Sequence, residues 1–291
     1  MASLIGTRSA PVLVVCAGRS GSTLLRAVLS RHPDLHVSVE SHFWLEAPGE
    51  AAFAASPTAA LQDYFASAPF RWLQLDPQLV LALLPARCTR REAFSAVMQA
   101  DAQRHGKQRF GDKTPAHAFV LPALLQAYPH AQVVHVVRDP RDVVASLARM
   151  PWASSSLLLN ALYTRASVHG VLSCRADPRV LSLRLEDLLA DPDVSLRRLL
   201  RHLQLPATDE IVRAMLRPAE AAPKPKPAPV PWLAEGFGPL RPAPLLYLGP
   251  PRPLGGLRAR FGGQSTTRSL RSCASSTKTQ LLLLSRPVST K

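Results

Sequence analysis

Residues 11–31 read PVLVVCAGRSGSTLLRAVLSR, an apolar run followed by a Gly/Ser/Arg turn and a helix-like segment. Val12 to Ala17 are continuously apolar and rich in β-branched residues, which predicts a strand buried on both faces of a parallel sheet. Gly18 and Gly21 allow a tight turn and a close approach of the backbone to a ligand. The helix starts at Ser22, where unpaired N–H groups and the helix dipole favour an anion. The stretch therefore predicts a phosphate-binding strand–loop–helix.

The loop differs from the nucleotide-triphosphatase P-loop GxxxxGK[ST], because no Lys precedes its hydroxyl pair. Its basic residue is Arg19, which stands before the second glycine and adds a permanent charge. This difference disfavours a P-loop kinase. A strand-to-helix turn without a ligand is the simpler alternative. The residues expected to contact an anion are Gly18, Arg19, Ser20, Gly21, Ser22 and Thr23.

Further apolar runs alternate with helical patterns along the chain. Strands are expected at 35–39, 109–112, 132–137 and 179–184, and helices at 22–31, 139–150, 156–174, 193–203 and 208–216, with several short helices within 57–104. Strands that alternate with helices predict an α/β fold with a parallel sheet. Ligands in such folds bind at the carboxyl ends of the strands.

Composition changes abruptly near residue 218. The chain has 291 residues, of which 47% are hydrophobic, enough for a sizeable core. Residues 218–291 hold 13 of the 28 prolines and eleven basic residues against two acidic ones, so most of the net charge of +15 lies there. We therefore expect one domain at 8–217 and a Pro-rich basic tail at 218–291 that is disordered and available to polyanions such as nucleic acid or a membrane surface.

The cysteine, histidine and hydropathy patterns argue against disulfide-rich, metal-binding and membrane-spanning proteins. The four cysteines form no CxxC pair, so neither a disulfide framework nor a zinc site is expected. His32, His36, His117 and His135 have no metal-ligand partners at a useful spacing. No apolar run approaches the roughly 18 residues that span a bilayer. The sequence thus predicts a cytoplasmic protein without a metal or a transmembrane segment.

Four more blocks follow the loop segment GRSGSTLLRAVLSRHPDL: VSVESHFW at 37–44, FGDKTP at 110–115, VVRDPRDVVAS at 136–146 and LRLEDLLADPDVSLRRLLRHLQLP at 183–206. In this order they resemble the sulfotransferases that use 3′-phosphoadenosine 5′-phosphosulfate, in their bacterial-type and tyrosylprotein-type versions. The resemblance covers about residues 10–206. It implies a P-loop-like three-layer fold, a central parallel sheet flanked by helices, and this co-substrate without a metal.

The resemblance also assigns roles to residues. Arg138 and Ser146 are expected to bind the 3′-phosphate, for which an Arg fork and a hydroxyl donor are suited. The alternative is that Arg138 pairs with Asp139 or Asp142 and that Ser146 is an ordinary helix residue. Arg19 is expected to contact the 5′-phosphosulfate.

Sulfuryl transfer also needs a base and a cation near the transferred group. Glu40 lies 21 residues after Arg19, as in tyrosylprotein-type enzymes, and is the expected base, with His42 as a second base. Lys113 is the expected cation. The alternatives are that Glu40 is an exposed acid pairing with a neighbour and that Lys113 is a solvated charge paired with Asp112.

Two departures from the family pattern keep a second function open. Leu185 precedes Glu186-Asp187 where the family often has Tyr, and Gly255 to Arg258 only weakly match a Gly-rich C-terminal loop that closes the 3′-phosphate site in many members. The expected activity is transfer to a hydroxyl or amine of a small-molecule, carbohydrate or peptide acceptor. The alternative is a protein that binds the donor nucleotide without turnover. Acceptor specificity is expected to lie in residues 45–108.

Overall fold

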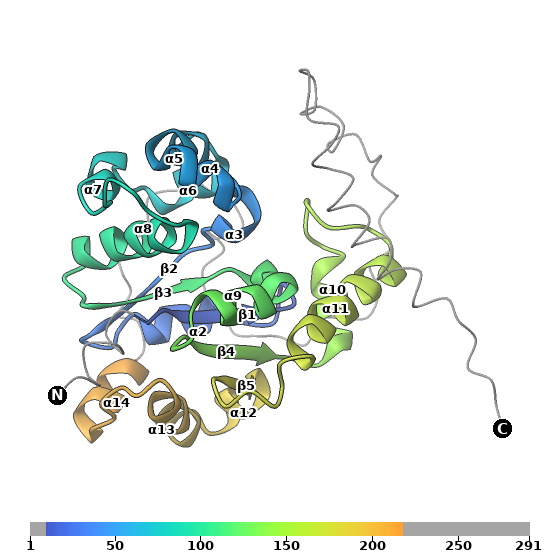
Figure 1. Ribbon diagram of the computed structural model, residues 1–291. Coiled ribbons are helices and arrows are strands. Elements are labelled where there is room, and N and C mark those ends of the chain that lie inside the picture. Colours follow the sequence, from blue (N-terminus) through green and yellow to red (C-terminus); the bar gives the residue numbers. More distant parts are fainter. Residues whose placement is uncertain (1–9, 218–291) are drawn as a thin grey trace. The chain divides into compact units, whose positions relative to one another are not determined.

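Five strands form one parallel sheet in the computed structural model, which describes residues 10–217 (Figure 1). They are β1 (Val12–Cys16), β2 (Leu35–Ser38), β3 (Arg109–Lys113), β4 (Gln132–Val137) and β5 (Val180–Arg184). Their order across the sheet is β2-β3-β1-β4-β5, and every neighbouring pair is parallel. The strands expected from the apolar runs are all confirmed.

Helices connect the strands and cover both faces of the sheet. They are α2 (Ser22–Leu29), α3 (Phe43–Glu46), α4 (Glu50–Ala55), α5 (Pro57–Phe65), α6 (Ala68–Leu73), α7 (Pro77–Leu81), α8 (Arg90–Arg104), the 3₁₀ helix η1 (Pro115–Val120), α9 (Leu121–Ala127), α10 (Pro140–Leu147), α11 (Leu157–Leu172), α12 (Leu185–Ala190), α13 (Pro192–His202) and α14 (Asp209–Leu216). Several begin with a proline in the first turn, where its missing N–H costs no hydrogen bond.

Two separate cores confirm the three-layer architecture. Val12, Val14 and Cys16 of β1 face a core completed by leucines of α2 and α13. Leu13 and Val15, on the other face of the same strand, belong to a core built with the aromatic residues of α3, α4, α5 and α8. Side chains alternate between the two faces of a strand, so a run that is apolar at every position must be covered on both sides. Figure 1 shows α13 and α14 on one side of the sheet and α5 to α8 on the other.

Some boundaries differ from the expectation. The helix expected at 139–150 ends at Leu147. Pro151 follows, and a proline disfavours helical backbone in the residue before it. The short helices α3, α4 and α12 were not expected, since four to six residues give too little periodicity to recognise.

Helix α11 packs with its polar side inward. Its buried residues are Asn160, Thr164, Ser167 and Val171, whereas Leu158, Leu159 and Leu162 are exposed. Asn160 donates to the carbonyl of Ser154, and Thr164 donates to the carbonyl of Asn160, so part of the polar face is satisfied locally. No helix within residues 10–217 is both long and apolar enough to cross a bilayer.

Truncation after Arg217 tests the expected domain boundary. Arg31 of α2 donates to the carbonyls of Met215 and Arg217, so α14 belongs to the described domain up to its last turn. We expect a chain ending at Arg217 to keep the thermal unfolding midpoint of the full chain to within about 2 °C, less than the shift that a loss of ~1 kcal/mol would give. Calorimetry of the two chains measures this. A large drop for the shorter chain would place the boundary beyond residue 217.

Candidate active site

The strand order brings the expected site residues to one edge of the sheet. Glu40 follows β2, Lys113 ends β3, the loop 17–21 follows β1, and Arg138 follows β4. Because these four strands are adjacent and parallel, their carboxyl ends form a continuous row. Residues as far apart in the sequence as Arg19 and Arg138, 119 positions, therefore lie side by side at this edge, where α/β folds bind ligands.

The loop between β1 and α2 has the backbone of an anion-binding turn. Arg19 and Gly21 have positive φ angles of 73° and 93°. A Cβ atom on Gly21 would lie 2.7 Å from Leu185 Cδ1, the movable end of that side chain, so it is the positive φ angle that favours glycine at this position. Gly21 occupies the position before α2 and has no side chain that could cap the helix. The first turn of α2 also holds no acidic residue. The N–H groups at the start of α2 therefore suit an anionic ligand.

Arg138 and Ser146, expected to form the 3′-phosphate site, are both connected to Arg19. Arg19 Nε donates to Ser146 Oγ at 3.1 Å, and Arg138 Nη1 donates to the Arg19 carbonyl at 3.3 Å. Arg138 Nη2 also donates to Asp142 at 3.3 Å, so the alternative ion pair is present as well. The side chain of Arg138 is only 14% exposed, whereas that of Asp142 is 45% exposed. The structure thus joins the loop 17–21 to α10 through the side chains of Arg19, Arg138, Asp142 and Ser146.

Glu40, Lys113 and His42 form a second cluster at the ends of β2 and β3. Lys113 Nζ donates to Glu40 Oε1 at 2.6 Å, and His42 Nε2 lies 3.3 Å from Glu40 Oε2. The Lys113 side chain is fully buried and that of Glu40 is 27% exposed. The alternative of a solvated Lys113 paired with Asp112 is therefore wrong. Glu40 is not fully exposed, but it does pair with neighbours, Lys113 and His42, as the alternative for this residue expects.

The charge state of Glu40 follows from this cluster. Burial raises the pKa of the carboxyl group, but the Lys113 ammonium and the hydrogen bond with His42 outweigh burial and lower the pKa to about 2. Glu40 is therefore ionised at neutral pH and accepts from both neighbours. A carboxylate with so low a pKa is a weak proton acceptor while it stays paired with Lys113.

The backbone of Ser41 and His42 is held by side chains that flank Lys113. Asp112 Oδ1 accepts from the Ser41 N–H at 3.2 Å, and Thr114 Oγ1 accepts from the His42 N–H at 3.3 Å. Tyr64 donates to the Ser41 carbonyl at 2.8 Å. His42 has a φ of 48°, a left-handed conformation that costs a non-glycine residue free energy. Three consecutive residues, 112–114, thus fix the three consecutive residues 40–42.

The sequence interpretation missed several residues of this edge. Asp112 and Thr114 stand in the FGDKTP block on either side of Lys113, so a signal was present. Glu186 of α12 accepts from the Asp139 N–H at 2.8 Å and connects this helix to the segment of Arg138. Trp72 of α6 contacts His42 edge-on, with ring centroids 5.8 Å apart, and nothing in the pattern around it distinguishes it.

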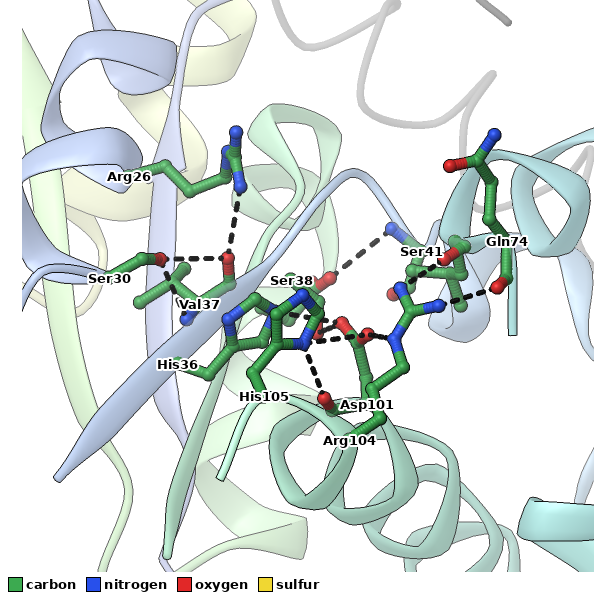
Figure 2. Close-up of polar contacts among 12 residues, drawn as sticks. Arg26, Ser30, His36, Val37, Ser38, Ser41, Gln74, Asp101, Arg104 and His105 are labelled. Atoms are coloured by element: carbon green, nitrogen blue, oxygen red, sulfur yellow. Dashed lines mark hydrogen bonds and ion pairs between the residues drawn. The ribbon is translucent and has the colours of Figure 1, made fainter. Parts of the chain in front are cut away.

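One histidine cluster in the described chain has metal-like spacing. One potential ligand atom from each of His36, Asp101 and His105 lies within 4.8 Å of the others. The Asp101 carboxylate already accepts from His36, Ser38 and Arg104, as Figure 2 shows. A guanidinium on the same carboxylate disfavours a cation there, so these residues do not fit a metal site.

The cysteines do not contribute a nucleophile to this edge. Cys16, Cys88 and Cys174 are free thiols within residues 10–217. Burial raises the pKa of Cys16, which ends β1 beside the loop, to about 12, so its thiol stays protonated. Cys273 and the Gly-rich segment Gly255 to Arg258 lie outside the described residues.

Comparisons with known proteins identify the family of the chain. The model of the family described as "Sulfotransferase family" matches residues 11–210. Omega-hydroxy-beta-dihydromenaquinone-9 sulfotransferase Stf3 of Mycobacterium tuberculosis is 33% identical over 119 residues, which cover 32% of this chain and 28% of that protein. Protein-tyrosine sulfotransferase 1 of Danio rerio is 25% identical over 207 residues, covering 67% of this chain and 53% of that protein. The chain thus spans about a quarter to a half of the length of these relatives.

A solved structure supports the fold. The sulfotransferase domain of the Synechococcus PCC 7002 olefin synthase superimposes with a TM-score of 0.54 at 23% identity, covering 81% of this chain and 90% of that domain. The family model matches more than half of the chain and includes the loop 17–21, Glu40, Lys113 and Arg138. The chain belongs to the sulfotransferase family.

Proposed function

We propose that the chain transfers a sulfuryl group from 3′-phosphoadenosine 5′-phosphosulfate to a hydroxyl or amine acceptor. The observation that carries this proposal is the adjacency, along one sheet edge, of an anion-binding loop and the Glu40–Lys113–His42 cluster. The loop suits the 5′-phosphosulfate, and Arg138 with Ser146 suits the 3′-phosphate. The cluster offers a proton acceptor and a buried cation beside them.

The donor is held by residues on both sides of β1. The N–H groups at the start of α2, together with Arg19, bind the anionic 5′ end of the nucleotide. Arg138 and Ser146 bind the 3′-phosphate, in part by releasing their present contacts with Asp142 and Arg19. This orients the phosphosulfate along the sheet edge toward Lys113 on the neighbouring strand.

The transfer step is a displacement at sulfur. The acceptor oxygen or nitrogen forms a bond to sulfur, while the bond between sulfur and the bridging oxygen of the 5′-phosphate breaks and its electron pair leaves with adenosine 3′,5′-bisphosphate. Glu40 takes the acceptor proton, and His42 is the second candidate for this role. Lys113 and Arg19 stabilise the charge that develops on the sulfuryl and bridging oxygens.

A second candidate function is donor binding without turnover. It is favoured by the Lys113–Glu40 pair, which holds the pKa of the expected base at about 2. In the transferring enzyme, the anionic donor competes for Lys113 and thereby restores basicity to Glu40. In a binding protein, the pair persists with the nucleotide present.

The acceptor class is open among small molecules, carbohydrates and peptides. The names of the two relatives point to a hydroxylated menaquinone in one case and to protein tyrosine in the other, and both are hydroxyl acceptors. A sulfate-transfer assay with labelled donor and a panel of lipid, phenol, carbohydrate and peptide acceptors tests the activity. Labelled product from any acceptor, lost in Glu40→Gln, supports transfer. Tight donor binding without product from the whole panel supports the second candidate.

Nucleotide preference provides a separate prediction. We expect adenosine 3′,5′-bisphosphate to bind far more tightly than ATP, because only the former offers a 3′-phosphate to Arg138 and Ser146. Arg138→Ala is expected to weaken the binding of adenosine 3′,5′-bisphosphate by ~1.5–3 kcal/mol, the usual cost of losing a charged hydrogen-bond partner. The affinity for ATP should be nearly unaffected. Titration calorimetry with both nucleotides measures the difference. Arg141→Ala is the control, since Arg141 is 87% exposed and pairs with Asp139. Equal affinity of the parent chain for both nucleotides would contradict the assignment.

A further inference from the structure

Left-handed backbone is concentrated around the candidate active site. Four non-glycine residues within residues 10–217 have positive φ, namely Arg19, His42, Gln74 and Gln204. Arg19 is in the donor loop, and His42 is in the Glu40 cluster. Gln74 ends α6 directly after Trp72 and Leu73, and the Trp72 ring contacts His42. Such backbone costs about 1–3 kcal/mol per residue and persists only where its surroundings fix it, most often at functional sites.

Arg104, at the end of α8, fixes the backbone at Gln74. Its Nη1 donates to the Gln74 carbonyl at 2.5 Å and its Nη2 donates to the Leu73 carbonyl at 2.5 Å. Its Nε donates to Asp101 Oδ1 at 2.7 Å, so all three nitrogens of the guanidinium are used. The planar fork therefore sets the end of α6, and with it the place of Trp72 against His42.

Asp101 connects this fork to the strand that leads to Glu40. Its Oδ2 accepts from Ser38 Oγ and, at 3.0 Å, from His36 Nε2 (Figure 2). Ser38 is the last residue of β2 and stands two positions before Glu40. Burial raises the pKa of Asp101, but the bonds from His36, Ser38 and Arg104 outweigh it, so the pKa is lowered and the carboxyl group stays ionised. One buried carboxylate thus anchors both segments.

We propose that Asp101 and Arg104 are positioning residues for the acceptor side of the active site. Asp101 holds Ser38 and the segment of Glu40, and Arg104 holds the Trp72 ring beside His42. The inference rests on the proposed function, because it takes the space beside Glu40, His42 and Trp72 as the place where the acceptor binds. Neither residue touches the reacting atoms, and both lie outside the sequence blocks that mark the family.

The two arms predict different kinetic effects. Arg104 positions the Trp72 ring beside the space proposed for the acceptor, so loss of the Arg104 hydrogen bonds weakens acceptor binding. The Ser38–Asp101 hydrogen bond positions the segment of Glu40, the proposed base, so loss of this bond slows the transfer step. Small displacements of positioned groups change rates strongly, which makes both effects measurable.

Arg104→Lys is the first test variant. Lysine keeps the charge next to Asp101 but cannot donate in a fork to two carbonyls and a carboxylate. We expect the acceptor KM to rise about 10-fold, with kcat and the Kd of adenosine 3′,5′-bisphosphate within about twofold of the parent values. Arg179→Lys is the matched control. Arg179 also pairs with an aspartate, Asp177, and donates to the carbonyls of Leu125, Tyr128 and Pro129, away from this edge. An unchanged acceptor KM in Arg104→Lys, or an equal rise in Arg179→Lys, would overturn the proposal.

Ser38→Ala tests the other arm. It removes one donor to Asp101 and leaves those of His36 and Arg104 in place. We expect kcat to fall about 3- to 10-fold at an unchanged acceptor KM. Ser195→Ala, which removes a buried hydroxyl bonded to the Asp187 carbonyl, is the control and should leave kcat unchanged. A kcat for Ser38→Ala equal to that of the parent chain would remove Asp101 from the proposal.

A spectroscopic readout separates this inference from the proposed activity. The Trp72 ring should shift the His42 ring protons through its ring current, and Trp72→Leu, which leaves no aromatic ring, should remove most of this shift in a ¹H–¹³C spectrum of the histidine-labelled full chain. The shift should change in Arg104→Lys and persist in Arg179→Lys. If the chain transfers no sulfuryl group but the shift behaves in this way, the positioning role stands and the proposed function fails. An unchanged shift in Arg104→Lys contradicts the positioning role whatever the activity.

Discussion

Glu40→Gln is expected to retain donor binding and to lose sulfuryl transfer by about 10²–10⁴-fold, the usual contribution of a general base. The amide keeps the size of the side chain but cannot take a proton from the acceptor. The donor contacts assigned to the loop, Arg138 and Ser146 do not include Glu40, so the Kd of adenosine 3′,5′-bisphosphate should change little. Single-turnover transfer rates and calorimetry measure the two quantities separately.

The control for this variant must account for the ion pair. Gln cannot neutralise the buried Lys113 ammonium, so thermal unfolding of Glu40→Gln should be measured alongside transfer and compared with Glu46→Gln, which changes an exposed acid of α3. A folded Glu40→Gln with near-normal turnover would exclude Glu40 as the base. His42, at 3.3 Å from Glu40 and beside Trp72, would then take its place.

Lys113→Met is expected to abolish most transfer and to reverse the pH dependence of stability at Glu40. In the parent chain the pKa of Glu40 is lowered to about 2, below its value of about 4.3 in an unfolded chain. The pair therefore contributes its full stability above about pH 4.3, and this stability is lost as the pH falls toward 2. Without Lys113, His42 is left to oppose burial, the largest single influence on the Glu40 carboxyl, so we expect the pKa of Glu40 to rise above its unfolded value. The variant should then be destabilised at neutral pH and gain stability on acidification through the raised pKa.

Denaturant unfolding between pH 3 and 7 measures this reversal. Removing one partner of a fully buried ion pair costs about 3–5 kcal/mol. The side chain of Glu40 is 27% exposed, so we expect about 2 kcal/mol at pH 7. Lys107→Met is the matched control, because Lys107 donates to the His32 carbonyl and has no role at this edge. A Lys113→Met chain whose stability falls on acidification as in the parent chain would show that Lys113 does not set the pKa of Glu40.

The strands and the tight loop between β1 and α2 were predictable because their signals are local. A β-branched run such as Val12 to Cys16 can only be satisfied by cover on both faces. Gly21 marks a turn that needs a positive φ. Each of these features depends on a few neighbouring residues and on the chain's own stereochemistry. The outer strands, the helix after Asp139-Pro140 and the three-layer arrangement follow from the same rules.

The ion-pair partners of charged residues and the buried face of α11 could not be predicted from the sequence in the same way. Lys113 has Asp112 as its sequence neighbour but pairs with Glu40, because side chains alternate along β3 and the end of β2 lies next to it in the sheet. Helix α11 has a leucine-rich sequence, yet it buries Asn160, Thr164 and Ser167, since its orientation is set by the elements against which it packs.

By itself, the sequence determined the family, the order of strands and helices along the chain, and the tight loop between β1 and α2, since each depends on short contiguous segments. Only the tertiary structure decided which groups meet: the Lys113–Glu40 pair, the hold of residues 112–114 on 40–42, and the Arg104–Asp101 anchor behind Trp72. Apart from the Arg104–Asp101 bond within α8, these contacts join residues 30 to 73 positions apart. They form because parallel strand ends and helix ends converge at one sheet edge. No local propensity encodes such convergence, because it follows from the packing of the whole domain.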